Sequence, residues 1–348
     1  MHLSDVLTKL PSNFRTSLAV RKQLIEICAQ NSDIAAHYYL GDSEEGRPVD
    51  AFVIGRGGKT VSLIAGAHSD EPVGPETLRI FILESLQLRQ ELTDLFDVYR
   101  FIVIPNINPD GEMKNQPWIT KWPDVSEYIR HAFRERPGRD IEFGYPEMRA
   151  ENQLVSAFLK EYAPLSLHMS LHGMGFSEGV MLLIERHWID QTAELRSRFA
   201  EYAKNLQLRL HDHDRKGEKG FLYIGPGFTT TPEGQAMQAY FRSLNDETTA
   251  QKFHLSSMEY ARELGGNPLS LVTELPLFVI DRMSPHKPPG IPSDYLDFKE
   301  EIPRLQLQLA EGKSIAETLD RYKVRSFDLA AAVKFQLFVI QLGLETIG

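Results

Sequence analysis

The sequence predicts an α/β fold, a mixed and mostly parallel twisted sheet with helices on both faces. One observation is a pair of continuous apolar runs at 60–66 and 99–105, which are typical of strands buried on both faces. The other is the helical pattern of 75–88 between them, because an alternation of strand, helix and strand favours a parallel sheet covered by helices. The 348 residues suffice for one large domain of this class or for two modest ones.

Local patterns justify the other elements in turn. Residues 14–31 carry apolar side chains at helical spacing, and the turn chemistry of "GDSEEGR" separates the two strands that follow. Pro75 suits the first turn of the helix at 75–88. The remaining predicted elements are, in chain order, strands at 35–40 and 48–55, a helix at 148–162, and strands at 165–171, 179–185 and 269–278.

Two long segments fall outside this alternation. The apolar pattern fades over 106–146, and a connection this long in a compact domain is often functional. From Tyr295 onward the chain is predicted to be helical, and "SIAE" at 314–317 matches a capping box. We expect a catalytic domain over 1–290 and a helical C-terminal extension over 291–348 packed on it, unless both form a single domain. The extension is interpreted as an appendage or an oligomer contact.

Composition and charge argue against several kinds of partner. The formal net charge is -10, so nucleic acid and anionic membranes are poor partners. The single cysteine, Cys28, allows no internal disulfide, so the fold does not depend on an oxidising compartment. The first residues do not match a signal peptide, and no window approaches about 18 uninterrupted apolar residues. We expect a cytoplasmic protein with no nucleic-acid or membrane partner, and leave a homo-oligomer open.

Two short motifs suggest chemistries that their context does not support. "GGKT" at 57–60 lacks the first glycine of a phosphate-binding loop, because Val53 stands where that glycine is needed. "GFSEG" at 175–179 fits the nucleophile elbow of a serine hydrolase, with Ser177 as the nucleophile. That elbow needs a helix directly after the serine, whereas an apolar strand pattern follows here. We favour a glycine-rich rim of a site instead.

His68 and Glu71 form an H-x-x-E pattern at the exit of the strand at 60–66, with Asp70 as a spacer between them. Imidazole and carboxylate are good zinc ligands, and a catalytic zinc usually takes three protein ligands and a water. Open α/β sheets bind their ligands at the carboxyl ends of their strands. A third ligand is therefore expected from the end of another strand.

"LSLHMSLHGMG" offers that ligand. His168, Ser170 and His172 share one face of a strand by their period of two, and His172 lies at the strand exit. His168 is interpreted as a core histidine with a plain hydrogen-bond partner.

Glu274 lies inside the apolar strand "LSLVTELPLF", where a carboxylate is costly to bury unpaired. It forms a salt bridge, or it is a general base whose pKa is raised by desolvation.

Six segments in one order resemble the zinc carboxypeptidase family, a group of metallocarboxypeptidases that also has deacylase relatives. The resemblance covers most of the chain. The segments that carry it are "GDSEEGRPVDAFVIG", "GAHSDEPVG", "PNINPDGE", "PEMRAE", "SLHGMG" and "VTELP".

The resemblance implies the same α/β fold and one zinc ion held by His68, Glu71 and His172. It implies that Glu274 activates a zinc-bound water as general base and then acts as general acid. Aligning "GRDIEFG" with the family's segment implies that Asp140 orients His68 through its second ring nitrogen. The oxyanion-stabilising arginine is best matched in spacing by Arg134, with the rivals Arg130 and Arg136.

The chain departs from the family at the place that binds the substrate's terminal carboxylate. Glu142 and Phe143 stand where peptidases carry Asn-Arg, and neither can replace an arginine fork. At this place the negative charge of Glu142 would repel a carboxylate of the substrate and favour an amine instead. Arg139 or Arg149 could supply a relocated clamp. The tyrosine that usually closes over the substrate is not evident near "QKFHLSS" at 251–257.

These residues favour a zinc-dependent hydrolase of a peptide or amide bond that resembles a metallocarboxypeptidase. The alternative on the same scaffold is an N-acyl amino acid deacylase or amidase, similar to aspartoacylase or succinylglutamate desuccinylase. The expected substrate is therefore a peptide or an acylated amino acid. A catalytically silent binding protein is disfavoured, because it would have no physical need for both the ligands and Glu274.

Overall fold

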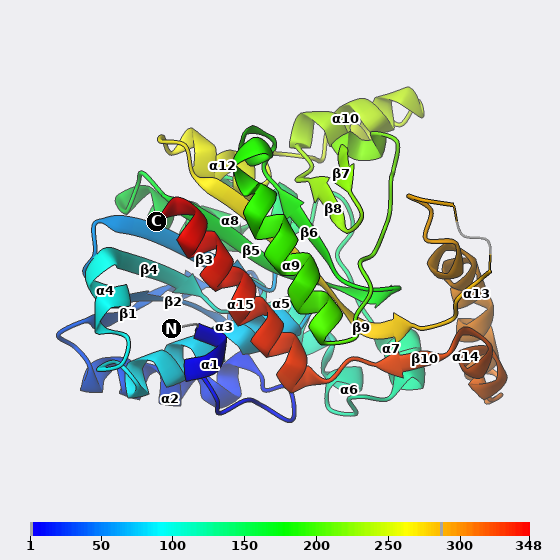
Figure 1. The fold of residues 1–348 in the computed structure, drawn as a ribbon, viewed down its shortest axis with the longest axis horizontal. Helices are drawn as coiled ribbons and strands as arrows, with labels where there is room; N and C mark the ends of the chain where they lie inside the picture. Colours follow the sequence, from blue (N-terminus) through cyan, green and yellow to red (C-terminus); the bar gives the residue numbers. More distant parts are fainter. Residues whose placement is uncertain (1–2, 286–287) are drawn as a thin grey trace.

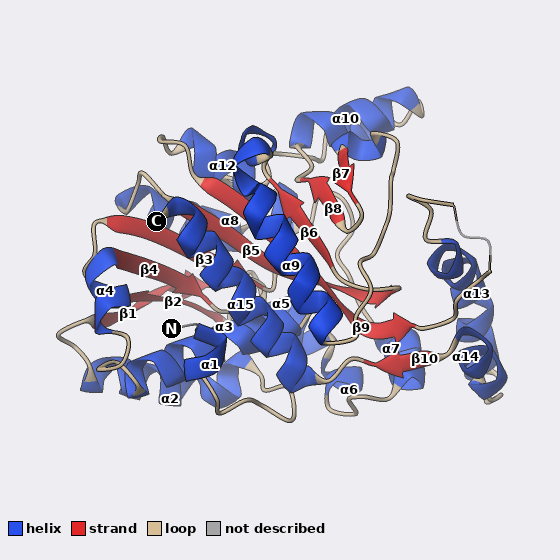
Figure 2. Cartoon of the chain, in the orientation of Figure 1, coloured by secondary structure: helices blue, strands red, loops and turns tan. Residues whose placement is uncertain are grey.

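A computed structural model of the chain describes residues 3–285 and 288–348. In these residues, ten strands form one mixed sheet that carries helices on both faces (Figures 1 and 2). The predicted α/β class is confirmed. The strands are β1 (Ala35–Asp42), β2 (Pro48–Ile54), β3 (Lys59–Ala65), β4 (Tyr99–Ile104), β5 (Leu167–Ser177), β6 (Met181–Ile184), β7 (Tyr223–Gly225), β8 (Phe228–Thr230), β9 (Leu269–Ile280) and β10 (Val324–Ser326).

Helices of three or more turns supply most of the cover, and shorter ones lie in the connections. The predicted connection over 106–146 contains three short α-helices, α5 to α7. The α-helices are α1 (Leu3–Val6), α2 (Ser17–Gln30), α3 (Val73–Gln87), α4 (Thr93–Val98), α5 (Pro109–Lys114), α6 (Gln116–Ile119), α7 (Val125–His131), α8 (Ala150–Glu161), α9 (Ala193–Asn205), α10 (Gly234–Ser243), α11 (Glu247–Ala250), α12 (Ser257–Glu263), α13 (Ser293–Ala310), α14 (Ala316–Tyr322) and α15 (Leu329–Ile347).

The strand order is β1-β2-β4-β3-β5-β9-β6-β8-β7, with β10 beside β9. The central strands β4, β3, β5 and β9 are parallel, whereas β1, β2 and β10 pair antiparallel. The carboxyl ends of the central strands therefore meet at one edge of the sheet. Functional side chains are expected at that edge in an open α/β fold.

The strand β5 is longer than its sequence pattern predicts. Its pairing with β3 ends at Ala65 and Leu171, but it continues to Ser177 beside β9. His172 is therefore not at a strand exit, as predicted, but within β5 and paired with Glu274 of β9. Because β3 has already ended there, the side of His172 that would face it is open to the segment after β3.

The two faces of β5 pack against different layers. Leu167 contacts α15, where a Cβ added to Gly343 would lie 3.1 Å from the Leu167 side chain. On the other face, His168 lies 3.0 Å from the Ser257 hydroxyl at the start of α12. Since successive side chains of a strand alternate between faces, His172 lies on the same face as His168.

The segment after residue 290 is not an appendage. Its helices α13 and α15 contribute Phe298, Leu305 and Phe335 to the same core cluster as the central strands. Gln336 of α15 also donates a hydrogen bond to the backbone oxygen of His172 at 3.1 Å. The C-terminal helix thereby fixes the backbone of a proposed metal ligand. The boundary at residue 290 stays a prediction.

The helix α15 is long and apolar enough to cross a membrane by length and composition alone. However, 61% of its most apolar window is buried inside the fold. It lies across the sheet in Figure 1 and packs on α3, β5 and β9. This burial is typical of a core helix in a globular domain.

The capping box predicted at 314–317 does not form. The helix α14 begins at Ala316 with Ile315 as its N-cap, and Ser314 accepts a hydrogen bond from the Ala316 amide at 3.2 Å. A capping box instead opens α12, where Ser256 and Glu259 satisfy each other's backbone amides. The capping-box motif is short, and whether a matching segment forms the box depends on how the surrounding chain packs.

Candidate metal centre and adjoining cavity

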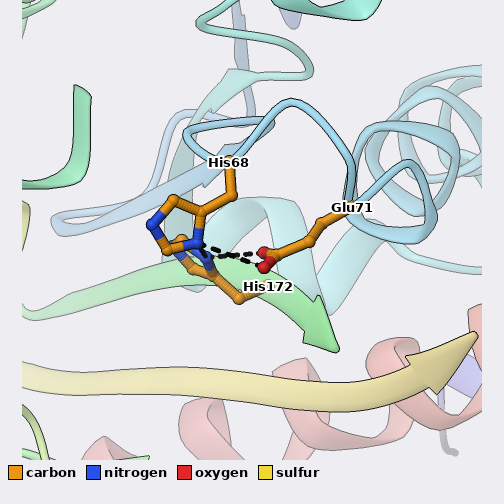
Figure 3. Close-up of side chains that lie close together, drawn as sticks. All are labelled: His68, Glu71 and His172. Carbon is orange, nitrogen blue, oxygen red and sulfur yellow. Dashed lines mark hydrogen bonds and ion pairs between the residues drawn. The ribbon is translucent and has the colours of Figure 1, made fainter. Parts of the chain in front are cut away.

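Three side chains converge beyond the end of β3, as Figure 3 shows. His68 Nδ1 lies 3.2 Å from Glu71 Oε1 and 3.0 Å from His172 Nδ1. His172 Nδ1 in turn lies 2.9 Å from Glu71 Oε2. The structure thus brings together the three predicted ligands, each with a ligating atom pointing at the other two.

Local backbone geometry presents the two ligands on the loop after β3. Gly66 has a φ of +80°, and a Cβ there would lie 2.3 Å from Asn106 Oδ1, so the turn requires glycine. The helix α3 then starts at Val73, directly after Glu71 and Pro72. Gly74 allows this first turn to approach β5, since its Cβ would lie 2.3 Å from the Leu171 carbonyl oxygen.

The donor set and its spacing fit zinc. Tetrahedral zinc with bonds of about 2.0–2.1 Å separates neighbouring ligand atoms by about 3.4 Å. The two Nδ1 atoms, and the nearest Glu71 carboxylate oxygen to each, lie 2.9–3.2 Å apart, within about half an ångström of that spacing. Two imidazoles and one carboxylate are also a common ligand set for catalytic zinc.

Carboxylates hold the second ring nitrogen of both histidines. His68 Nε2 lies 3.4 Å from Asp140 Oδ2, which is the contact that the resemblance implies. His172 Nε2 lies 3.0 Å from Glu142 Oε2. Such outer partners fix the orientation of a ligating imidazole and raise its basicity. The segment "DIE" thus provides one partner for each histidine.

The predicted role of Glu142 in the substrate pocket is wrong. Its side chain is buried behind His172, and its carboxylate accepts hydrogen bonds from Ser170 Oγ at 3.0 Å and the Ser257 amide at 3.2 Å. Burial opposes its ionisation, but the hydrogen bond with His172 lowers the pKa of Glu142 to about 2. A carboxylate held in this way orients a ligand and does not meet substrate.

The other two residues predicted for the substrate pocket also point elsewhere. Phe143 is buried and packs edge-on against Phe253, with ring centroids 5.5 Å apart. Arg139 is exposed and forms an ion pair with Glu44. Neither residue lines the cavity that contains Glu274. These two residues therefore contribute nothing to the cavity beside the metal ligands.

Replacing Glu142 by Ala is expected to weaken zinc binding by about 10- to 100-fold, because His172 loses its fixed orientation. Competition with a chromophoric chelator measures the zinc affinity. Asp140→Ala is the matched variant for His68 and is expected to act in the same direction. Unchanged zinc affinity in a folded Glu142→Ala chain would show that the contact is only structural.

A cavity of about 340 Å³ adjoins the metal ligands. Glu71, Glu274 and Arg134 line it, together with residues of α13. The Glu274 Oε2 atom is buried and has no hydrogen-bond partner within the described part of the chain. Burial first, and then the charge of Glu71, raises the pKa of Glu274 to about 8. Glu274 therefore does not form the salt bridge that was its alternative interpretation.

Arg134 is the arginine that reaches the metal ligands. Its Nε donates to Asp70 Oδ1 at 2.7 Å, and its guanidinium also pairs with Glu71. Asp70 is thus a positioning residue for this guanidinium and not a mere spacer. Of the two rivals, Arg130 pairs with Glu127, and Arg136 lines a different cavity.

The wall contributed by α13 was missed by the sequence patterns. Tyr295, Phe298 and Lys299 line the same cavity as Glu274. Burial, and more weakly the charge of Glu274, raises the pKa of Tyr295. These residues follow a plain helical pattern, and only their place next to a distant strand makes them part of the site.

Burial and hydrogen bonding show the roles of His168 and Ser177, the two remaining residues that the sequence analysis discussed. His168 is fully buried between the hydroxyls of Ser62 and Ser257, and burial lowers its pKa to about 4, so it is a core histidine as expected. Ser177 is fully buried and donates to the Gly179 carbonyl oxygen at 2.5 Å. It lies in a strand followed by another strand, so the serine-hydrolase elbow is absent from this position.

Comparison with known proteins defines the class to which this fold and site belong. The model of the zinc carboxypeptidase family matches residues 20–212, more than half of the chain. The chain therefore belongs to the zinc carboxypeptidase family, which makes it a zinc hydrolase. No curated protein matches it in sequence.

Solved structures show the same fold at low sequence identity. Carboxypeptidase A from Helicoverpa armigera is 13% identical, with a TM-score of 0.53 over 99% of this chain and 78% of that chain. A proposed metallopeptidase from Shewanella denitrificans is 13% identical, with a TM-score of 0.51 over 95% of both chains. The likeness to both proteins concerns the fold alone.

Proposed function

We propose that this protein hydrolyses a peptide or amide bond in the manner of a metallocarboxypeptidase, with zinc held by His68, Glu71 and His172. The observation that carries the proposal is the Glu274 carboxylate. It lies in the cavity that Glu71 lines, and its Oε2 is buried with no hydrogen-bond partner among the described residues. Zinc, when bound, supplies a Lewis acid that lowers the pKa of a water.

Glu274 acts as the general base and then as the general acid. Its raised pKa brings proton exchange close to neutral pH, where such a group is most effective. Oε2 accepts the proton from the attacking water and later delivers it to the leaving amine. The neighbouring cavity provides the room in which the scissile group lies next to this atom.

Arg134 stabilises the negative charge that develops on the carbonyl oxygen of the substrate. Its guanidinium lies beside Glu71 and lines the same cavity as Glu274. The ion pair with Asp70 holds it at this place before substrate arrives. A donor positioned in advance costs no reorganisation during the reaction, which is why such groups are effective.

A deacylase or amidase is the second candidate, and one observation favours it. The residues that replace the family's arginine fork, Glu142 and Phe143, are buried and packed. No carboxylate clamp of the usual kind can therefore be built at these two positions. Both candidates use the same base and metal ligands and differ in the leaving group that they accept.

A panel of substrates separates the two candidates. N-acylated dipeptides with free C-termini are expected to be hydrolysed and to lose most of their kcat/KM on C-terminal amidation. A deacylase would instead favour N-acyl amino acids over these dipeptides. Chromatography of the released amino acids measures both reactions. A chain that hydrolyses neither class, with zinc bound, would contradict the proposed function.

A further inference from the structure

The side chain of Gln336 is fully buried in α15, within the otherwise apolar run "FQLFVI" at 335–340. This helix packs on the face of the sheet that Leu167 shares, which is opposite to the face that carries His172. A buried amide costs free energy unless its polar atoms find partners. The partners of this amide therefore indicate why a polar residue is placed there.

Both polar atoms of the Gln336 amide bind elements that carry the site. Nε2 donates to the His172 backbone oxygen at 3.1 Å and to Thr273 Oγ1 at 3.0 Å. Oε1 accepts a hydrogen bond from Thr77 Oγ1 at 2.6 Å. A backbone oxygen can only accept, so the NH₂ group must face β5 and the orientation of the amide is defined. Gln336 thus connects β5, β9 and α3.

The peptide group between His172 and Gly173 is held at both of its polar atoms. Its oxygen accepts hydrogen bonds from Gln336 Nε2 at 3.1 Å and from Thr273 Oγ1 at 3.3 Å. Its N–H donates to Glu71 Oε2 at 3.1 Å. Because a peptide group is planar, an orientation imposed on the oxygen also sets the direction of the N–H. The hydrogen bonds of Gln336 therefore reach the Glu71 carboxylate as well as the backbone of His172.

The same amide also binds the strand that carries the proposed base. Thr273 directly precedes Glu274 in β9, so the side chains of these two residues point to opposite faces of the sheet. Glu274 is also the residue of β9 that pairs with His172 of β5. Since Gln336 Nε2 binds both His172 and Thr273, one side chain fixes the two strands relative to each other at this pair.

We propose that Gln336 is a positioning residue that holds two zinc ligands, His172 and Glu71, in place relative to the general base. The inference rests on the proposed function and assigns part of its machinery to the far side of the sheet. Ligands that are oriented in advance bind metal more tightly, and a base at a fixed place reacts faster. Gln336 lies outside residues 20–212, which match the family model, so the C-terminal helix of this chain supplies this support.

Zinc affinity provides the first test, and it requires no activity. Gln336→Met keeps a buried side chain of similar length but removes the three hydrogen bonds of the amide. We expect it to weaken zinc binding by about tenfold, as for a group that orients metal ligands. Competition with a chromophoric chelator measures this affinity. Thr77→Val removes only the hydroxyl that holds Oε1, so it should act in the same direction with a smaller effect.

The kinetic constants provide the second test. With zinc at saturation, Gln336→Met is expected to lower kcat by about tenfold or more and to leave KM nearly unchanged. A displaced base weakens an interaction that is made only in the transition state, whereas Gln336 does not line the cavity in which substrate is proposed to lie. Steady-state hydrolysis of an N-acylated dipeptide measures both constants.

Val339→Ala separates positioning from a general loss of stability. Val339 is fully buried about one turn further along α15, and its truncation leaves a void in the core without removing a hydrogen bond. This variant should also lower the melting temperature but keep the zinc affinity and the kcat of the wild type. The inference is overturned if Gln336→Met equals Val339→Ala in zinc affinity or in kcat. If Gln336→Met does not fold, the same comparison is made with Thr77→Val.

Zinc affinity also separates the failure of this inference from the failure of the proposed function. If the zinc-loaded wild type hydrolyses no substrate, the proposed function fails, and a lower zinc affinity of Gln336→Met still supports the positioning of the ligands. If the wild type hydrolyses the dipeptide and Gln336→Met does so equally well, the inference fails and the proposed function stands.

Discussion

Replacing Glu274 by Gln is expected to lower kcat by about a thousandfold or more, within the range known for general acid–base groups. Glutamine has nearly the same shape but cannot accept the proton from water. The Glu274 Oε2 atom lies buried in the cavity without a hydrogen-bond partner among the described residues, so nearby groups offer no substitute. Steady-state hydrolysis of an N-acylated dipeptide measures the effect.

Zinc content is the decisive control for this variant. Glu274 is not one of the three clustered ligand residues, so Glu274→Gln should bind zinc as the wild type does. Ser177→Ala serves as a second control, because Ser177 is buried and lines neither cavity. Full turnover in a zinc-loaded Glu274→Gln chain would show that another group is the base.

Replacing His172 by Ala is expected to abolish tight zinc binding and to reduce hydrolysis by at least about a thousandfold. Two ligands remain after the change, and the Lewis acid that is worth several kcal/mol is lost with the metal. Metal analysis after dialysis and a parallel activity assay measure both effects. His131→Ala is the matched control, since His131 is a half-exposed histidine at the end of α7.

Part of this loss could come from the fold, so stability must be measured as well. His172 is buried and contacts Glu142, which would be left without this partner in the variant. His172→Gln retains a polar side chain of similar reach and should show the same loss of zinc with a smaller loss of stability. Wild-type zinc content in either variant would exclude His172 as a ligand.

The sequence was sufficient to predict features that depend on short-range patterns. The central strands and α3 followed from apolar runs and helical spacing, because burial on both faces imposes such runs. His68 and Glu71 were found because they follow a buried strand, and His172 because it directly follows the part of β5 that pairs with β3. Glu274 was found because a carboxylate is unusual inside an apolar strand.

Features that depend on packing between distant segments could not be predicted. Glu142 was assigned to substrate by its alignment, but the approach of α12 and β5 places it against His172. Tyr295 and Lys299 join the cavity only because α13 returns to the sheet edge. The length of β5 was underestimated because its pairing with β9, and not its own sequence, extends it past His172.

The central claim is that one zinc ion at His68, Glu71 and His172 makes this chain a hydrolase. The most direct measurement is a titration of zinc into the chelator-treated protein, with bound metal and peptide hydrolysis recorded on the same samples. We expect activity to be absent at the start and to rise in proportion to bound zinc up to one ion per chain. Hydrolysis that persists without metal, or a chain that binds no zinc, would contradict it.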